Sequence, residues 1–256
     1  MDLELDDKVF LITGGTDGLG AALAERLVVD RARVVVCGRN QARVDAMTAR
    51  FDELGGDALA ISADVTVRAD LERMVNVAVE RWNRIDGVVN NAGTAAADNF
   101  EAITDDQWIA DMDLKVMAAV RLTELALPYL RDSGGSIVNV LSIAAKAPGA
   151  RSLPSAASRA TGMAITKALS QELGPDGVRA NAVLIGLVES GQWRRRAEAA
   201  DRPVSDIYAG LAKLVPLGRV GRDDEFADLV TFLLSNRSSY VTGSAINLDG
   251  GMSPVV

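Results

Sequence analysis

Short runs of apolar, mostly β-branched residues alternate along this chain with longer segments in which apolar residues recur at helical spacing. Seven short runs stand out, and most of their positions are apolar rather than every second one. Strands of this kind are buried on both faces, which is typical of a parallel sheet covered by helices on both sides. The predicted strands span residues 9–12, 33–37, 58–61, 85–89, 136–140, 178–184 and 245–248.

Helical patterns fill the intervals between these runs, over residues 19–30, 41–54, 69–82, 104–130, 155–173 and 224–234. Because crossovers between parallel strands are right-handed, we expect a doubly wound α/β sheet of the Rossmann type. No linker or tandem repeat interrupts the pattern, so residues 1–256 are predicted to form a single domain. In such sheets ligands bind beyond the carboxyl ends of the strands.

Composition narrows the function classes. The chain is 48% hydrophobic with a formal net charge of −8, which argues against nucleic acid or an anionic membrane surface as a partner. No apolar run approaches the roughly 20 residues that cross a bilayer. A single cysteine and no histidine exclude an internal disulfide and disfavour a metal site. The acidic start lacks a secretory pattern, so we expect a cytoplasmic protein with no metal.

A glycine-rich turn follows the first predicted strand, and its sequence is Thr13-Gly14-Gly15-Thr16-Asp17-Gly18-Leu19-Gly20. Glycines allow a tight turn, close approach of a pyrophosphate and close packing of helix on strand. The next helix would aim free N–H groups and its positive dipole end at the phosphates. Taken alone, the turn is equally consistent with an ordinary strand–helix connection.

Two further strand ends favour a dinucleotide. Asp64-Val65 follows the third predicted strand, where a carboxylate can accept a hydrogen bond from an adenine amino group. Asn90-Asn91-Ala92-Gly93 follows the fourth, where small residues let a ribose approach the backbone. Each motif is weak alone, but the order and spacing of all three predict a dinucleotide site.

With the Ser142 segment, the Gly186 turn and the closing stretch from Val241 to Gly251, these motifs resemble the short-chain dehydrogenase/reductase family. The resemblance covers essentially the whole chain. It implies a nicotinamide cofactor, the strand order 3-2-1-4-5-6-7, and a homotetramer or homodimer paired through the two long central helices. The expected cofactor-binding residues are Gly14, Thr16, Asp17, Gly18, Leu19, Gly20, Arg39, Asp64, Val65, Asn90, Ala92, Gly93, Arg159, Gly186, Val188 and Ser190.

The end of the second predicted strand bears on the choice of cofactor. NAD-binding proteins usually carry an acid there for the ribose hydroxyls, whereas this chain has Gly38 and then Arg39. A planar guanidinium can pair with a 2′-phosphate, although Arg39 could equally be a solvated residue at the start of a helix. Asp17 argues the other way, because many NADP-dependent relatives carry a basic residue at that point. NADP(H) is favoured over NAD(H).

The nicotinamide side of the expected site departs slightly from the family pattern. Ile185-Gly186-Leu187-Val188-Glu189-Ser190 stands where the family has Pro-Gly-x-x-x-Thr. The resemblance implies that the Val188 backbone and the Ser190 hydroxyl hold the carboxamide. Ile185 in place of proline is expected to loosen the turn without removing these groups.

The expected reaction centre differs from the family pattern more than the nicotinamide side does. The resemblance implies a working set of Asn, Ser, Tyr and Lys, of which only the serine remains, as Ser142. Ser155 stands at the tyrosine position, Arg159 at the lysine position and Lys115 at the asparagine position. A serine hydroxyl has no accessible ionised form near neutral pH, and a guanidinium stays charged. The usual proton transfer through a tyrosine cannot occur.

Lys115 offers a replacement acid. Partly desolvated and near Arg159, its ammonium would have a lowered pKa and could protonate a carbonyl oxygen that Ser142 orients. Alternatively, Lys115 is structural and fills the space of a shortened side chain. Lys146 is a second candidate for the acid, and the alternative interpretation is that it is a solvated lysine in a loop.

Two functions are favoured over a third, which is non-redox chemistry such as dehydration with a tightly held cofactor. The first is an atypical NAD(P)(H)-dependent oxidoreductase that reduces a carbonyl or oxidises a secondary alcohol, with Lys115, water or a substrate group as proton donor. The alternative is a catalytically degenerate pseudoenzyme, acting as a dinucleotide-binding or assembly module.

Residues 189–215 correspond to the substrate lid of the family. Trp193 with Arg194, Arg195 and Arg196 could meet an acidic or thioester-linked substrate, or form the solvated face of a short helix.

Overall fold

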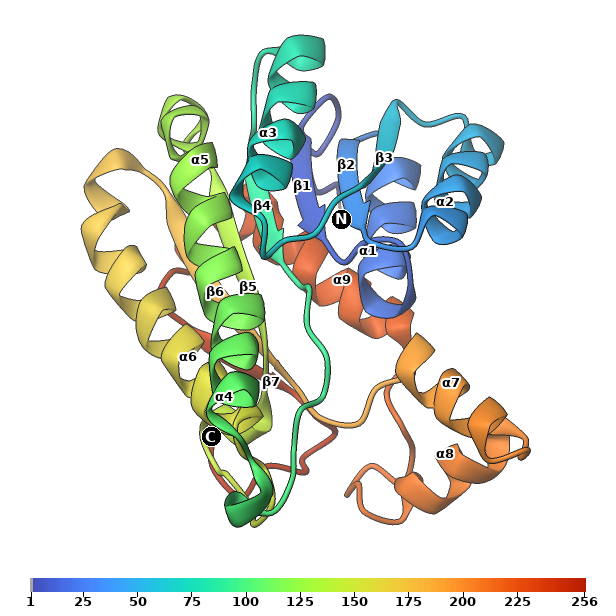
Figure 1. The fold of residues 1–256 in the computed structure, drawn as a ribbon. Helices are drawn as coiled ribbons and strands as arrows, with labels where there is room; N and C mark the ends of the chain where they lie inside the picture. Colours follow the sequence, from blue (N-terminus) through green and yellow to red (C-terminus); the bar gives the residue numbers. More distant parts are fainter. Residues whose placement is uncertain (1) are drawn as a thin grey trace.

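A computed structural model describes residues 2–256, and its centre is a seven-stranded sheet in which every neighbouring pair of strands is parallel (Figure 1). The order β3-β2-β1-β4-β5-β6-β7 confirms the doubly wound arrangement. The strands are β1 (Val9–Thr13), β2 (Arg33–Gly38), β3 (Ala58–Ser62), β4 (Gly87–Asn90), β5 (Ser136–Ser142), β6 (Arg179–Ile185) and β7 (Ala245–Leu248).

Helices cover both faces of the sheet (Figure 1). Successive residues of β1 alternate between the two apolar cores: Phe10 and Ile12 belong to one, Val9 and Leu11 to the other. This burial on both faces explains the continuous apolar strands in the sequence. On one face lie α1 (Gly18–Val29), α2 (Gln41–Leu54) and α9 (Asp223–Leu234), and on the other α3 (Arg68–Trp82), α5 (Ala118–Ser133) and α6 (Ser155–Glu172).

The long helix predicted over 104–130 is one continuous run with an interruption. Thr104 caps its start. The Thr104 side chain accepts a hydrogen bond from the Gln107 N–H, and the Gln107 side chain accepts one from the Thr104 N–H. The run consists of α4 (Asp105–Met112), a π-helical turn η2 (Asp113–Met117) and α5. A π turn inserts an extra residue and is frequent at functional sites. Lys115 lies within it and is buried.

Two helices that the sequence pattern did not resolve lie beyond the carboxyl ends of the strands (Figure 1). They are α7 (Gly191–Ala199) and α8 (Val204–Ala212), and both fall within residues 189–215. The two ends of this segment, which the sequence analysis assigns as a lid, lie side by side, since Val188 forms a parallel bridge with Gly221.

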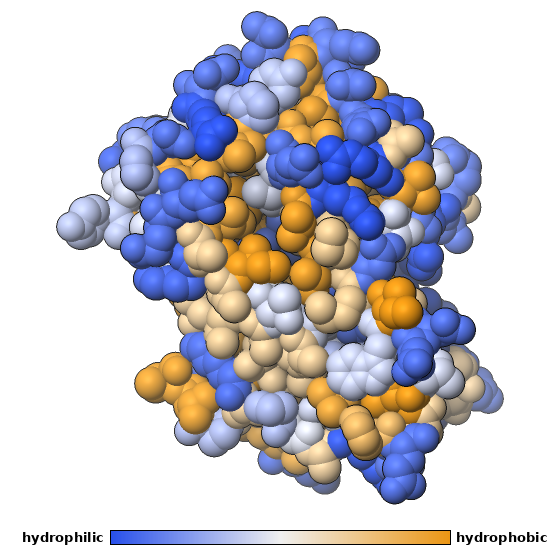
Figure 2. Space-filling model, turned by 60° about the vertical axis from the view of Figure 1, so that its left-hand side comes forward, coloured by the Kyte–Doolittle hydropathy of each residue, from blue (hydrophilic) through white to orange (hydrophobic). Residues whose placement is uncertain are grey.

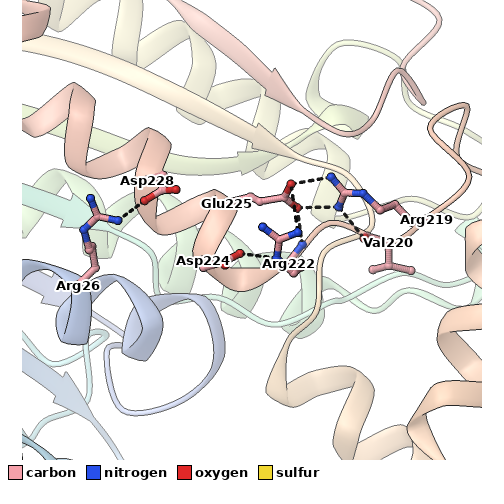
Figure 3. Close-up of polar contacts among 7 residues, drawn as sticks. All are labelled: Arg26, Arg219, Val220, Arg222, Asp224, Glu225 and Asp228. Atoms are coloured by element: carbon pink, nitrogen blue, oxygen red, sulfur yellow. Dashed lines mark hydrogen bonds and ion pairs between the residues drawn. The ribbon is translucent and has the colours of Figure 1, made fainter. Parts of the chain in front are cut away.

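The return from the lid is anchored to the first turn of α9, as Figure 3 shows. Glu225 accepts hydrogen bonds from both terminal nitrogens of the Arg219 guanidinium, at 2.6 and 2.8 Å, and from the Arg222 N–H at 2.8 Å. These contacts lower the pKa of Glu225 to about 2, and the hydrogen bond from Arg219 has the largest effect. The carboxylate is therefore ionised at neutral pH and also complements the helix dipole.

No helix within residues 2–256 combines the length and the apolar character that crossing a membrane requires.

The remaining elements are short. The 3-10 turns are η1 (Phe100–Ala102), η3 (Ile143–Ala145), η4 (Gly174–Asp176) and η5 (Asn236–Ser238).

Candidate functional site

The glycine-rich turn after β1 has the shape that a dinucleotide pyrophosphate requires. Gly14 has φ of +65°, and a Cβ there would lie 3.0 Å from the Ala92 Cα. A Cβ on Gly20 would collide with the Gly14 carbonyl oxygen. The Asp17 side chain does not cap α1, so the first N–H groups of that helix are left for a ligand. The turn therefore fits the predicted cofactor.

The loop after β4 is bonded directly to this turn. The Thr13 hydroxyl accepts hydrogen bonds from the Asn91 and Ala92 N–H groups, both at 3.0 Å. The Asn91 side chain donates to the carbonyls of Thr13 and Gly14, at 2.9 and 3.1 Å. Asn91 is thus the residue that joins the two loops, a role that the sequence did not reveal.

The neighbouring Asn90 lies deeper. It is 8% exposed, and its side-chain amide donates to the Asn139 side chain at 2.8 Å, within the interior. Its amide nitrogen is engaged with β5, whereas its Oδ1 is buried without a hydrogen-bond partner.

At the ends of β2 and β3, Arg39 and Asp64 form an ion pair at 3.6 Å. The Asp64 carboxylate also accepts hydrogen bonds from the Thr66 N–H at 2.9 Å and the Thr66 hydroxyl at 2.7 Å. Burial acts to raise the pKa of Asp64, but these bonds and the Arg39 charge outweigh it and lower the pKa. The Arg39 side chain is 68% exposed and so available to a ligand phosphate.

Asp17 is surrounded by arginines. Its carboxylate lies 3.3 Å from Arg43 of α2 and 3.5 Å from Arg194 of α7, and it bonds to Arg195 still more closely. Burial acts to raise the pKa of Asp17, but the Arg195 hydrogen bond and the three positive charges lower it overall. Asp17 is therefore ionised, but three arginines surround it and supply positive charge at the point where many NADP-dependent relatives carry a basic residue.

The same contacts revise the interpretation of the lid arginines. Arg194 and Arg195 hold α7 against the glycine-rich turn, and the Arg196 guanidinium stacks on Trp193 at 4.8 Å. The three arginines are exposed on a short helix, as the second sequence-based alternative expected, and the ion pairs of Arg194 and Arg195 with Asp17 are added to it.

The turn after β6 is closed by a hydrogen bond to β7. The Gly186 N–H donates to the Leu248 carbonyl of β7 at 3.0 Å. A Cβ on Gly186 would lie 2.7 Å from the Asp249 Cβ, so the close approach depends on glycine. Ser190 stands directly before α7 in an extended conformation.

The reaction centre contains a connected chain of four polar side chains, three of them buried and the fourth, Ser155, half-buried. The Lys115 ammonium, on a side chain that is 1% exposed, donates to the Ser155 hydroxyl at 2.5 Å and to the Asp111 carboxylate. The second Asp111 oxygen accepts a hydrogen bond from the Ser158 hydroxyl at 2.6 Å. The structure thus brings together Lys115 and Ser155, as their family positions predict, and adds Asp111 and Ser158.

Arg159 lies on the other side of Lys115. Its guanidinium donates to the Val140 carbonyl at 2.5 Å, and a Cβ on Gly93 would lie 2.7 Å from its Nη2. Burial lowers the pKa of Arg159 to about 10, so it is charged at neutral pH. Lys115 and Arg159 both line a cavity of 190 Å³ between α5, α6 and the sheet.

Burial lowers the pKa of Lys115, the Arg159 charge lowers it further, and Asp111 partly offsets both effects. The first two causes are those that the sequence predicted. The third depends on a residue that the sequence analysis passed over. Asp111 stands four residues before Lys115 in the chain, and this spacing was the one signal that could have revealed it.

Ser142 and Lys146 occupy different places. The Ser142 hydroxyl, at the end of β5, accepts a hydrogen bond from the Ala144 N–H at 3.3 Å. Lys146 donates to the Ala245 carbonyl at 2.9 Å and the Asn247 side chain at 3.0 Å. Lys146 is therefore half-buried against β7, neither solvated nor directed at Ser155.

Comparisons with known proteins agree with this fold. The family model described as enoyl-(acyl carrier protein) reductase matches residues 14–253. The chain is 31% identical over 251 residues to a 3-oxoacyl-[acyl-carrier-protein] reductase of Thermotoga maritima, covering 98% of this chain and 99% of that one. The chain belongs to the short-chain dehydrogenase/reductase family, and it is an oxidoreductase of that family.

Two solved structures are similar over nearly their full length. One is an NADPH-bound short chain oxidoreductase from Pseudomonas aeruginosa PAO1 containing an atypical catalytic center, with a TM-score of 0.91, 33% identity, and coverage of 98% and 100%. The other is L-sorbose reductase from Gluconobacter frateurii, complexed with NADPH and L-sorbose, with a TM-score of 0.95, 29% identity and complete coverage of both chains.

Proposed function

We propose that this chain catalyses the NADP(H)-dependent reduction of a carbonyl compound, or the reverse oxidation of a secondary alcohol, with Lys115 as the proton donor. The observation that carries the proposal is the contact between the Lys115 ammonium and the Ser155 hydroxyl at 2.5 Å, at the position where the family has its tyrosine. A buried ammonium that reaches this point can supply the proton that the missing phenol would supply.

The cofactor, when bound, supplies the hydride. Among the residues of this chain, the glycine-rich turn and the start of α1 would hold the pyrophosphate, and Arg39 the 2′-phosphate. The Val188 backbone and the Ser190 hydroxyl would hold the carboxamide. Arg159 keeps its positive charge at the base of the site, where it can donate to ribose hydroxyls.

Proton transfer during reduction then involves three side chains. Ser142 donates a hydrogen bond to the substrate oxygen and orients it. The Ser155 hydroxyl gives its proton to that oxygen while taking one from the Lys115 Nζ, so that Ser155 ends unchanged and Lys115 ends neutral. Solvent returns the proton to Lys115 after each turnover. Positioned acid catalysis of this kind contributes about 10²- to 10⁴-fold in rate.

Three observations support NADP(H) over NAD(H). Arg39 is largely exposed at the end of β2, Asp17 is neutralised by Arg43, Arg194 and Arg195, and both structures described above contain NADPH. A 2′-phosphate placed here would meet a net positive charge.

Arg39→Ala is therefore expected to weaken NADPH binding by about 10- to 100-fold, the equivalent of one charge-assisted hydrogen bond. NADH binding should change little, because NADH lacks the 2′-phosphate. Isothermal titration of both cofactors measures the difference. Equal losses for the two cofactors would contradict the assignment of Arg39.

The function itself is tested by incubating the protein with NADPH and a panel of β-ketoacyl thioesters, ketoses and diketones. We expect oxidation of NADPH with at least one substrate class. NADPH carrying deuterium on one face of C4 should transfer its label with a single stereochemistry. Tight cofactor binding without transfer to any member of the panel would overturn the proposal and favour the pseudoenzyme.

We also infer that copies of the chain pair through the face formed by α5 and α6, as the family resemblance implies. Apolar side chains gather across the middle of this face in Figure 2, and its exposed apolar residues include Met117 of η2 and Ala164 and Ala168 of α6. Burial of such a patch between subunits is favourable. Sedimentation velocity should give a dimer or tetramer, and a monomer at micromolar concentration would exclude this pairing.

A further inference from the structure

We propose that Asp111 is the positioning residue of the reaction centre, which holds the Lys115 ammonium against Ser155 and keeps it protonated at neutral pH. This inference rests on the proposed role of Lys115 as proton donor. It assigns to Asp111 an electrostatic task that the asparagine, serine, tyrosine and lysine of the family pattern do not include.

The first argument is burial. The Asp111 and Lys115 side chains are 2% and 1% exposed, so water contributes almost nothing to the solvation of either charge. A buried charge without a partner costs several kcal/mol, whereas a paired and hydrogen-bonded one is tolerated. The Asp111 carboxylate is therefore the main reason that the buried Lys115 can stay charged.

The second argument is charge. The charged groups that face the Lys115 ammonium are Asp111 from α4 and Arg159 from α6, while Ser155 and Ser158 are neutral. Arg159 retains its proton at neutral pH. Without Asp111, two cations would face each other in a buried site, and the lysine would be the one to lose its proton.

The third argument is orientation. The carboxylate is fixed from both ends: one oxygen binds Lys115 and the other accepts the Ser158 hydroxyl at 2.6 Å. Ser158 lies in the first turn of α6, whose positive dipole end favours a nearby anion. The π turn after Met112 places Lys115 on the inner side of the helix, where the fixed carboxylate directs its Nζ to Ser155.

The test compares wild type with Asp111→Asn, which removes the charge and keeps the shape. If Lys115 must be protonated for reduction, kcat/KM falls as the pH rises through the pKa of Lys115. Loss of the carboxylate lowers that pKa further. The basic limb of the pH profile should therefore move to lower pH by about one to three units.

Asp113→Asn is the matched control, since Asp113 belongs to the same helical run but forms a separate, half-buried pair with Arg121 at 2.8 Å. It should keep the wild-type limb. Ser158→Ala should move the basic limb in the same direction as Asp111→Asn, but by less. Ser158→Thr retains the hydroxyl, so its basic limb should stay at the wild-type position. Ser158→Ala also serves as the second variant if Asp111→Asn does not fold.

A measurement on the cofactor-free protein checks the same shift directly. The chain has five lysines, so a ¹³Cε-lysine spectrum is simple, and the signal lost in Lys115→Met identifies Lys115. Its titration midpoint should fall in Asp111→Asn, or in Ser158→Ala, relative to wild type. An unchanged midpoint and an unchanged limb, with Lys115→Met still inactive, would overturn the role of Asp111 and leave the proposed function standing. Full activity of Lys115→Met would instead remove the proposed function.

Discussion

Replacing Lys115 by methionine is expected to lower kcat/KM for carbonyl reduction by about 10²- to 10⁴-fold. Methionine is similar in length and has no proton to give, so the Ser155 hydroxyl loses the group that resupplies it. The binding of NADPH should stay within a few-fold of wild type, because Lys115 contacts Ser155 and Asp111 rather than the glycine-rich turn. Steady-state kinetics and calorimetry measure the two quantities.

The variant leaves Asp111 buried without its cation, which threatens the fold as well as the chemistry. The double variant Lys115→Met with Asp111→Asn removes both charges and should recover thermal stability while remaining inactive. Lys146→Met is the matched lysine control. Its ammonium binds the Ala245 carbonyl and Asn247, so it should retain activity. Activity within threefold of wild type in Lys115→Met would show that the proton comes from elsewhere.

The sequence was sufficient for the sheet and for most helices. Periodic apolar positions determine which residues are buried, and so α2 (Gln41–Leu54) and β7 (Ala245–Leu248) begin and end at the predicted residues. The lid helices were not resolved because α7 is largely polar, with only Gly191 and Ala197 buried. A helix without an apolar stripe gives no periodic signal.

The reaction centre was only partly predictable, for a related reason. Family positions indicated Lys115, Ser155 and Arg159, and these do lie around one another. An aspartate four residues before a lysine is an ordinary pair on the exposed face of many helices. Only the packing of α6 against this stretch shows that Asp111 is buried and hydrogen-bonded to Ser158.

The charge environment of the glycine-rich turn was beyond sequence reasoning as well. Asp17 and Arg195 are 178 residues apart in the chain, and their pairing follows from the placement of α7 at the start of α1. In the sequence alone, Asp17 was an argument against NADP(H). In the structure, its ion pairs with Arg194 and Arg195 connect the glycine-rich turn to α7.

The second large effect is expected for Gly20→Ala, which should weaken NADPH binding by at least about 10²-fold. A Cβ at this position would collide with the Gly14 carbonyl oxygen and lie 2.6 Å from the Asn91 side-chain nitrogen. Both atoms belong to the hydrogen-bonded junction between the two cofactor loops, so neither can move alone. A displacement of about 1 Å in a positioning element can cost 10²-fold. Calorimetric titration with NADPH measures the loss.

Alanine is otherwise the better helix former, by about 1 kcal/mol over glycine, so any loss must come from the collision. Gly210→Ala is the control for this point, because Gly210 lies in α8 with no atom within 4 Å of an added Cβ. That substitution should leave cofactor affinity unchanged and raise the thermal midpoint slightly. If Gly20→Ala binds NADPH as tightly as Gly210→Ala does, the turn after β1 does not hold the pyrophosphate, and the cofactor site must be sought elsewhere on the sheet.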